Sequence, residues 1–227
     1  ETDPLKRASS FDHTAETATP SYYTVDLKDY GIHAELTGLS RAGIMQFTFQ
    51  QDGDHYIVIE PNSDEGVAFI QIDPEKKEIT GYNPVHRIYQ GRGKEAGFSG
   101  HFVIQLNEEI ADYGVWDSTA VTSTQGRKHN VGAWVKLASD KPGKALVRVG
   151  TSFTSIENAR KNLIAEIPGW DFDKVRRASS DTWNQALGQI AVKGNNEEEK
   201  VKFYSALYNA HFLPRTFSDT DGSYPKF

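Results

Sequence analysis

The sequence predicts a mainly β chain in which an antiparallel β-sandwich is followed by α-helices. Short segments of alternating apolar and polar residues recur from Tyr22 to about Phe153, with no helical pattern between them. Turn residues separate these segments, and Asp52-Gly53-Asp54 is a strong hairpin signal among them. From Thr154 onward the apolar spacing changes to three and four residues, which is the period of a helix. These three observations favour a sandwich or barrel that leads into a helical segment.

The predicted strands rest on alternation with a period of two. In the clearest case, Ile32, Ala34 and Leu36 lie on one face of a strand and the residues between them are polar. The same pattern predicts about nine strands, namely Tyr22–Leu27, Ile32–Thr37, Gly43–Phe49, His55–Ile59, Val67–Ile72, Glu78–Tyr82, Gly100–Leu106, Ala133–Leu137 and Ala145–Gly150. Two stretches of mixed charge, Gly91–Gly97 and Ser118–His129, are predicted to be long surface loops.

Three helices are predicted after the strands. Thr154 and Glu157 have the spacing of a capping box, so the first helix should begin there. Asp171 is the predicted N-cap of the second helix, which carries one apolar stripe. Asn195-Asn196 should cap the third, because three glutamates follow in the first turn, where the helix dipole favours negative charge.

The third predicted helix is apolar on nearly every side. Beyond Lys202 its body carries no charge, and two other helices are too few to bury Phe203, Tyr204, Leu207 and Tyr208. We therefore expect the chain to be a fragment whose helical continuation covers this helix. The expected division is a β-sandwich over residues 1–153, a helical linker over 154–194, and a truncated helical domain over 195–227.

The composition excludes several functional classes. Lys and Arg total 25 against 31 Asp and Glu, giving a formal net charge of −6, whereas nucleic-acid binding depends on a clustered positive face. The absence of cysteine excludes disulfides, thiol nucleophiles and cysteine-bound metals. No apolar run approaches the ~20 residues that cross a bilayer. The sequence also lacks a phosphate-binding glycine loop and a nucleophile elbow.

Two polar clusters are candidates for ligand binding. His13 and Glu16 precede the first predicted strand, where they could hold a polar ligand or close their own loop. Asp219 and Asp221 follow the third predicted helix, where they could accept hydrogen bonds from sugar hydroxyls or form an Asx turn. The residues by themselves do not choose between these alternatives.

Six segments occur in an order typical of one enzyme family. They are Phe11–Glu16 with Pro20–Tyr23, Tyr22–Thr37, Ile167–Phe172, Trp183–Leu187, Phe203–Tyr208 and Phe217–Tyr224. Together they resemble glycoside hydrolase family 92, the calcium-dependent exo-acting α-mannosidases. Asp12, Ser21 and Ser223 depart from the Ser, Gly and Arg that are usual in the family's motifs.

The resemblance implies a fold and an activity. The fold would be an N-terminal β-sandwich, entered partway by this chain, then a helical linker and an (α/α)6 barrel that starts at residue 195. The activity would be inverting, exo-acting hydrolysis, with α-1,2 preference, that removes terminal mannose from N-glycan or mannan chains. The resemblance also implies a calcium cofactor and a periplasmic or secreted bacterial location. The alternative is a non-catalytic carbohydrate-binding or structural β-sandwich module.

The resemblance further implies where the chemistry lies. Both catalytic carboxylates and most calcium ligands would lie beyond Phe227, so we assign no catalytic residue and expect this chain alone to be inactive. Asp219 and Asp221 are the first candidates for substrate contacts, followed by His13 and Glu16. The expected partners are a mannose-containing oligosaccharide and the rest of the catalytic domain.

Overall fold

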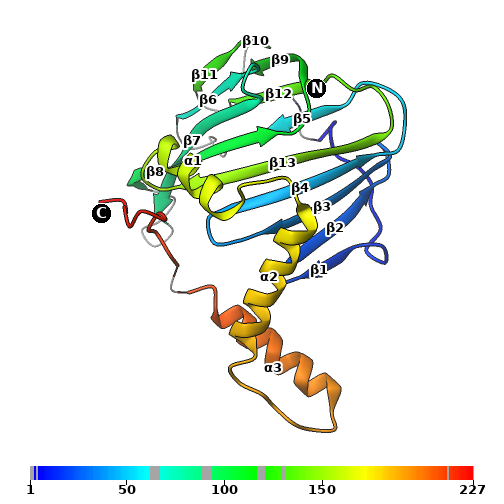
Figure 1. The fold of residues 1–227 in the computed structure, drawn as a ribbon, viewed down its shortest axis with the longest axis vertical. Coiled ribbons are helices and arrows are strands. Elements are labelled where there is room, and N and C mark those ends of the chain that lie inside the picture. Colours follow the sequence, from blue (N-terminus) through cyan, green and yellow to red (C-terminus); the bar gives the residue numbers. More distant parts are fainter. Residues whose placement is uncertain are drawn as a thin grey trace.

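The computed structural model describes residues 3, 5–61, 67–87, 94–116, 121–128, 131–213 and 215–226. Over these residues the chain forms thirteen strands and then three helices (Figure 1). The strands make two sheets, of nine and four strands, in which every pairing is antiparallel. The predicted fold class, a mainly β sandwich followed by α-helices, is therefore confirmed.

The larger sheet carries most of the chain. In spatial order its strands are β1 (Thr17–Thr19), β2 (Tyr22–Leu27), β3 (Ile32–Gly38), β4 (Ala42–Phe49), β13 (Gly143–Ser152), β8 (Lys94–Leu106), β7 (Glu78–Arg87), β6 (Ala68–Asp73) and β11 (Gln125–Lys128). The smaller sheet has the order β10 (Val121–Ser123), β9 (Ile110–Trp116), β12 (Gly132–Leu137) and β5 (Tyr56–Ile59). The last strand of the chain, β13, thus lies in the middle of the larger sheet, between β4 and β8.

The main core lies between the two sheets, as the alternation of the strands requires. Ile70, Ile79 and Val147 of the larger sheet pack in one cluster with Val115 and Val135 of the smaller sheet. The opposite, outer face of the larger sheet also carries apolar residues around β4, β8 and β13, which would be exposed to solvent if the helices did not cover them.

Helix α1 (Ile156–Glu166) covers that outer face (Figure 1). Its Ala159 and Leu163 are completely buried in a second cluster with Ile44 and Val103 of the sheet. The approach is close because β13 has a glycine there: a Cβ at Gly150 would lie 2.3 Å from the carbonyl oxygen of Ala159. Residue 150 must therefore stay without a side chain for α1 to lie in this position.

Helix α2 (Phe172–Leu187) leaves the sandwich and carries α3 (Glu197–Ala210) at its far end (Figure 1). Asp171 caps α2 by accepting a hydrogen bond from the Lys174 amide, as predicted. Near the sheet, the Arg176 guanidinium lies 3.6 Å from the centre of the Tyr22 ring, a cation–π contact that holds the helix to β2.

Helix α3 begins where the sequence predicts, with Asn196 accepting from the Glu199 amide. It packs on α2 through Tyr208, whose ring centre is 5.0 Å from that of Trp183. None of its residues is buried, and 64% of Val201 is exposed. The apolar surface predicted for this helix is therefore uncovered in the described part of the chain.

Some sequence predictions were wrong in detail. Ser118–His129 was predicted as a loop but contains β10 and β11, and β8 begins at Lys94 inside the other predicted loop; residues 91–93, 117–120 and 129–130 lie outside the described part. The strands β1 and β9 were also missed. The first helix is capped by Ser155, not Thr154, because the Thr154 hydroxyl bonds elsewhere, as described below.

Candidate functional site

The most elaborate polar site in the described residues surrounds the carboxylate of Asp219, which is only 4% exposed. Its Oδ2 accepts hydrogen bonds from the hydroxyls of Ser152, at 2.9 Å, and Thr154, and from the Asn158 amide at 3.1 Å. Its Oδ1 accepts one from the Asn162 amide at 2.7 Å. Four neutral donors therefore stabilise a buried carboxylate that would otherwise be costly to remove from water.

Two elements bring these donors together. Ser152 ends β13, and Asn158 and Asn162 lie four residues apart on one face of α1. The Thr154 hydroxyl, one residue before the Ser155 cap, donates to the carboxylate. The site thus forms where the last strand passes into the first helix. Asp219, which binds there, follows Asn162 by 57 residues in the sequence.

The segment that carries Asp219 is itself fixed as a turn. The Asp219 amide donates to the Ser223 carbonyl at 2.7 Å, and Gly222, with a φ of 85°, donates back to the Asp219 carbonyl at 3.0 Å. The Arg41 guanidinium donates to the carbonyl of Ser218 at 2.6 Å. The turn is therefore bound to the loop between β3 and β4 as well as to α1.

Asn162 completes the attachment with its other amide atom. This side chain has no exposed surface, and its Oδ1 accepts from both the amide and the hydroxyl of Thr220, each at 2.9 Å. Close by, Phe217 packs against Phe153 with ring centres 5.1 Å apart. Polar and apolar contacts thus both hold residues 217–220 on the sandwich.

His101 lies next to the site, paired with Ser152 across the strands. The Nδ1 of His101 is buried without a hydrogen-bond partner in the described residues. Burial lowers the pKa of His101, and the negative charge of Asp219 only partly offsets that effect. The neutral imidazole is therefore favoured in this position.

Asp221 is the accessible carboxylate of the turn. It accepts from the Ser223 amide at 3.0 Å, and this hydrogen bond is the main reason that its pKa is lowered. Lys161 approaches it at 3.6 Å. Unlike Asp219, the residue is exposed, so lone pairs of its carboxylate remain accessible to a ligand.

The other predicted pair, His13 and Glu16, forms a contact of its own. The His13 ring lies 2.8 Å from Glu16 Oε2, and the Tyr23 hydroxyl donates to Oε1 at 2.6 Å. The Tyr23 hydrogen bond, followed by that of His13, lowers the pKa of Glu16. This pair lies beside β1 and β2, at one edge of the larger sheet.

The structure does not bring the two predicted pairs into one site. In the order of the sheet, β3 and β4 separate β2 from β13, where Asp219 is bound (Figure 1). Sequence reasoning missed Asn158 and Asn162, the residues that bind Asp219 from α1. A signal for them was present, because two asparagines four apart inside a helix are unfavourable unless their side chains have a specific role.

The described residues do not offer a metal centre. They contain no group of three or more His, Asp or Glu side chains arranged to hold an ion. Ca²⁺ requires six to eight oxygen ligands, whereas the buried oxygens of Asp219 are occupied by hydroxyl and amide donors. The side chains at this site therefore do not fit a bound calcium ion.

No helix in the described part is both long and apolar enough to span a bilayer.

Two protein-family models match consecutive parts of the chain. The N-terminal domain model of glycosyl hydrolase family 92 matches residues 1–152, and the catalytic domain model of the same family matches residues 158–227. The chain belongs to glycosyl hydrolase family 92. Within this family frame, Ser152 is the last residue of the N-terminal match and Asp219 lies in the catalytic match, so their hydrogen bond joins the two.

Solved structures of family 92 enzymes have the same fold. The inverting mannosidase BT2199 of Bacteroides thetaiotaomicron matches with a TM-score of 0.84 and 25% identity, over 95% of this chain and 29% of that enzyme. The α-mannosidase BT3965 of the same organism matches with a TM-score of 0.83, also at 25% identity, over 95% of this chain and 30% of that one.

A fungal relative matches by sequence. It is described as an uncharacterized secreted glycosidase of Arthroderma benhamiae, and it is 27% identical over 88% of this chain and 29% of its own length. This family 92 chain therefore spans about three tenths of the length of the relatives it matches.

Proposed function

We propose that this chain is part of an inverting exo-α-mannosidase that removes terminal mannose, with α-1,2 preference, from N-glycan or mannan chains. The observation that carries the proposal is the pair of family matches, in order and joined at Asp219. The similarity to an inverting mannosidase supports the reaction type. The match to the catalytic domain model speaks against the alternative, a non-catalytic carbohydrate-binding or structural module.

Inverting hydrolysis needs two carboxyl groups on opposite sides of the glycosidic bond. One protonates the leaving oxygen and the other activates a water, so the two stand about 6.5–9.5 Å apart. We place both of them, and the calcium ligands, in the remainder of the catalytic domain of the complete protein. The poor fit of the Asp219 site to calcium is consistent with that placement.

In this proposal the residues of the turn have different tasks. Asp219 positions the turn, because its oxygens already accept hydrogen bonds from four side chains of the protein. Asp221 is the better candidate to accept hydrogen bonds from mannose hydroxyls, since it is exposed and its lowered pKa keeps it ionised. His13 and Glu16 would contact the sugar chain at a separate place. We propose a periplasmic or secreted location, and the description of the fungal relative as secreted supports the second of these.

The test is hydrolysis of α-linked mannobioses by the complete protein. We expect release of mannose from the α-1,2 isomer, with the β-anomer of mannose appearing first in NMR spectra because the reaction inverts configuration. Asp221→Ala should lower activity while the protein stays folded. Initial release of the α-anomer, or no release from any mannobiose, would refute the proposed reaction. Mannose release by the 227-residue chain alone would refute the placement of the catalytic carboxylates.

A further inference from the structure

A row of side chains crosses the outer face of the larger sheet beside the N-terminus of α1. The strand register pairs Phe69 of β6 with Tyr82 of β7, Tyr82 with His101 of β8, and His101 with Ser152 of β13. Directly paired residues in adjacent strands point to the same face. Within this register only His101 separates the aromatic pair Phe69 and Tyr82 from Ser152, which binds Asp219.

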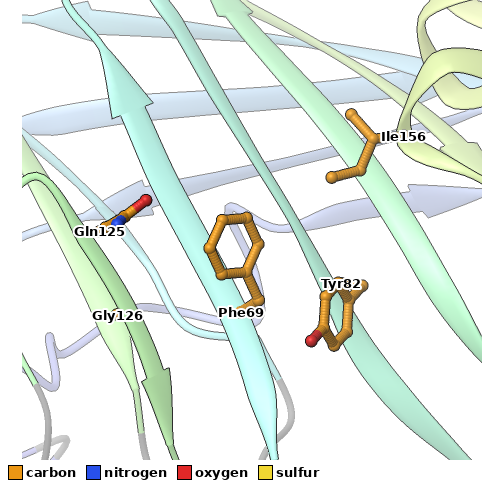
Figure 2. Close-up of a pocket in the computed structure, with 5 residues that line it drawn as sticks. All are labelled: Phe69, Tyr82, Gln125, Gly126 and Ile156. Atoms are coloured by element: carbon orange, nitrogen blue, oxygen red, sulfur yellow. The ribbon is translucent and has the colours of Figure 1, made fainter.

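The aromatic end of this row lies in an open groove. The groove has a volume of about 460 Å³ and is lined by Phe69, Tyr82, Gln125, Gly126 and Ile156. Figure 2 shows the two rings next to each other on neighbouring strands, with Ile156 and Gln125 on opposite sides of them.

The two rings are nearly parallel neighbours. Their centres are 5.6 Å apart and their planes differ by 25°. Both rings are partly exposed, whereas Ala68 and Ile70, on either side of Phe69 in β6, are completely buried in the main core. The inner face of β6 thus supplies the core, and its outer face leaves aromatic surface available for a ligand.

The chemistry of the groove favours a neutral, polyhydroxylated ligand. The faces of aromatic rings carry partial negative charge and attract the C–H groups on the face of a pyranose. Gln125 adds an amide that both donates and accepts, and exposed Gln71 is its direct partner across the strands. The lining residues that the structure describes carry no charge.

We propose that this groove binds sugar units of the mannose chain other than the one that is cleaved, an inference that rests on the proposed function. Among the residues that the structure describes, the groove lining supplies no carboxyl group, so the proposed role of these residues is to hold the glycan and not to cut it. The pyranose rings stack on Phe69 and Tyr82, and the Gln125 amide bonds to their hydroxyls. The site extends the glycan contacts of the protein onto the sandwich.

The experiment is an NMR titration of the ¹⁵N-labelled 227-residue chain with an α-linked mannotriose. The amide signals of Tyr82, Gln125 and Gly126 should shift as the sugar is added. Phe69→Ala and Tyr82→Ala should each weaken binding by roughly tenfold, equivalent to about 1.4 kcal/mol. Tyr82→Phe keeps the ring and should keep the binding. An unchanged thermal midpoint would show that this variant keeps its fold.

The matched control is Tyr56→Ala. Tyr56 is also a strand residue with an exposed ring next to another aromatic, Trp134, but it lies in β5 of the smaller sheet. This variant should bind mannotriose as the unmodified chain does. Equal weakening by Tyr56→Ala, or no shift of the groove signals at millimolar sugar, would overturn the proposal. Shifts that follow protein concentration instead of sugar would assign the groove to a second copy of the chain and would also overturn it.

The two proposals fail separately. Hydrolysis of mannobiose by the complete protein, without mannotriose binding at the groove, would refute the subsite and leave the proposed function intact. Mannotriose binding at Phe69 and Tyr82, in a complete protein that cleaves no α-mannoside, would refute the proposed function and leave a glycan-binding site.

Discussion

The carboxylate of Asp219 and the amide of Asn162 form a hydrogen bond of 2.7 Å between the turn at 218–223 and helix α1. Asn162 has no exposed surface and Asp219 has 4%. A hydrogen bond to an ionised group in such surroundings is about twice as strong as one between neutral groups. The pair therefore fixes the position of the accessible Asp221, two residues further along the chain.

Asp219→Asn should destabilise the chain by about 1–3 kcal/mol. The change preserves size but replaces one accepting oxygen with an NH₂ group, which must then face a donor from Ser152, Thr154, Asn158 or Asn162. Urea unfolding measures the loss. The control is Asp221→Asn, which should stay within about 0.5 kcal/mol because that side chain is exposed. Equal effects of the two substitutions would contradict the assignment of Asp219 as the buried, hydrogen-bonded carboxylate and Asp221 as the exposed one.

His101 should make stability depend on pH. Burial lowers its folded-state pKa below the unfolded value of about 6.5, so the unfolded state binds more protons between these two values. The stability that the neutral, buried His101 contributes is fully present above pH ~6.5 and is lost as the pH falls toward the folded-state pKa. Unfolding free energies measured from pH 7 to 5 should decline less in His101→Phe. A folded-state pKa at or above 6.5 in an NMR titration would refute this prediction.

The same titration tests the electrostatic link between His101 and Asp219. The charge of Asp219 raises the pKa of His101 against the larger effect of burial. Asp219→Asn should therefore lower the His101 pKa further, since the attraction for the imidazolium is lost. An unchanged or raised His101 pKa in that variant would show that the two groups do not interact.

Gly150→Ala should displace α1 from the sheet. The added Cβ would lie 2.3 Å from the Ala159 carbonyl oxygen and 2.6 Å from the Leu163 Cβ, and overpacking of this kind costs roughly 1–3 kcal/mol. Gly169→Ala is the matched control, because a Cβ there has no neighbour within 4 Å. Thermal unfolding compares the two. A Gly150→Ala variant as stable as its control would mean that α1 does not lie as described.

Much of the fold could be predicted from local patterns. The alternation in β3 is clear because one face is buried and the other is polar. The caps Asp171 and Asn196 were predicted because a cap depends on residues a few positions away. By contrast, β11 has the polar sequence Gln125–Lys128 of an edge strand, and its assignment depends on pairing with distant β6. Such a segment cannot be distinguished from a loop without its partner.

The candidate site could be predicted only in part. Asp219 and Asp221 were recognised as a polar cluster, but their different environments could not be read from two residues in one turn. What buries Asp219 is a set of side chains 57 to 67 residues earlier in the sequence. The position of Thr154 illustrates the limit: its spacing to Glu157 fits a capping box, yet its hydroxyl binds Asp219 and Ser155 caps the helix.

The most direct test of the account is a double-mutant cycle between Asp219 and Asn162. The central claim is that this buried pair holds the turn at 218–223 on helix α1, which itself packs on the β-sandwich. Unfolding free energies of Asp219→Ala, Asn162→Ala and the double variant should give a coupling of about 0.5–3 kcal/mol. Effects that simply add, to within about 0.5 kcal/mol, would show that the pair is not coupled and would contradict the claim.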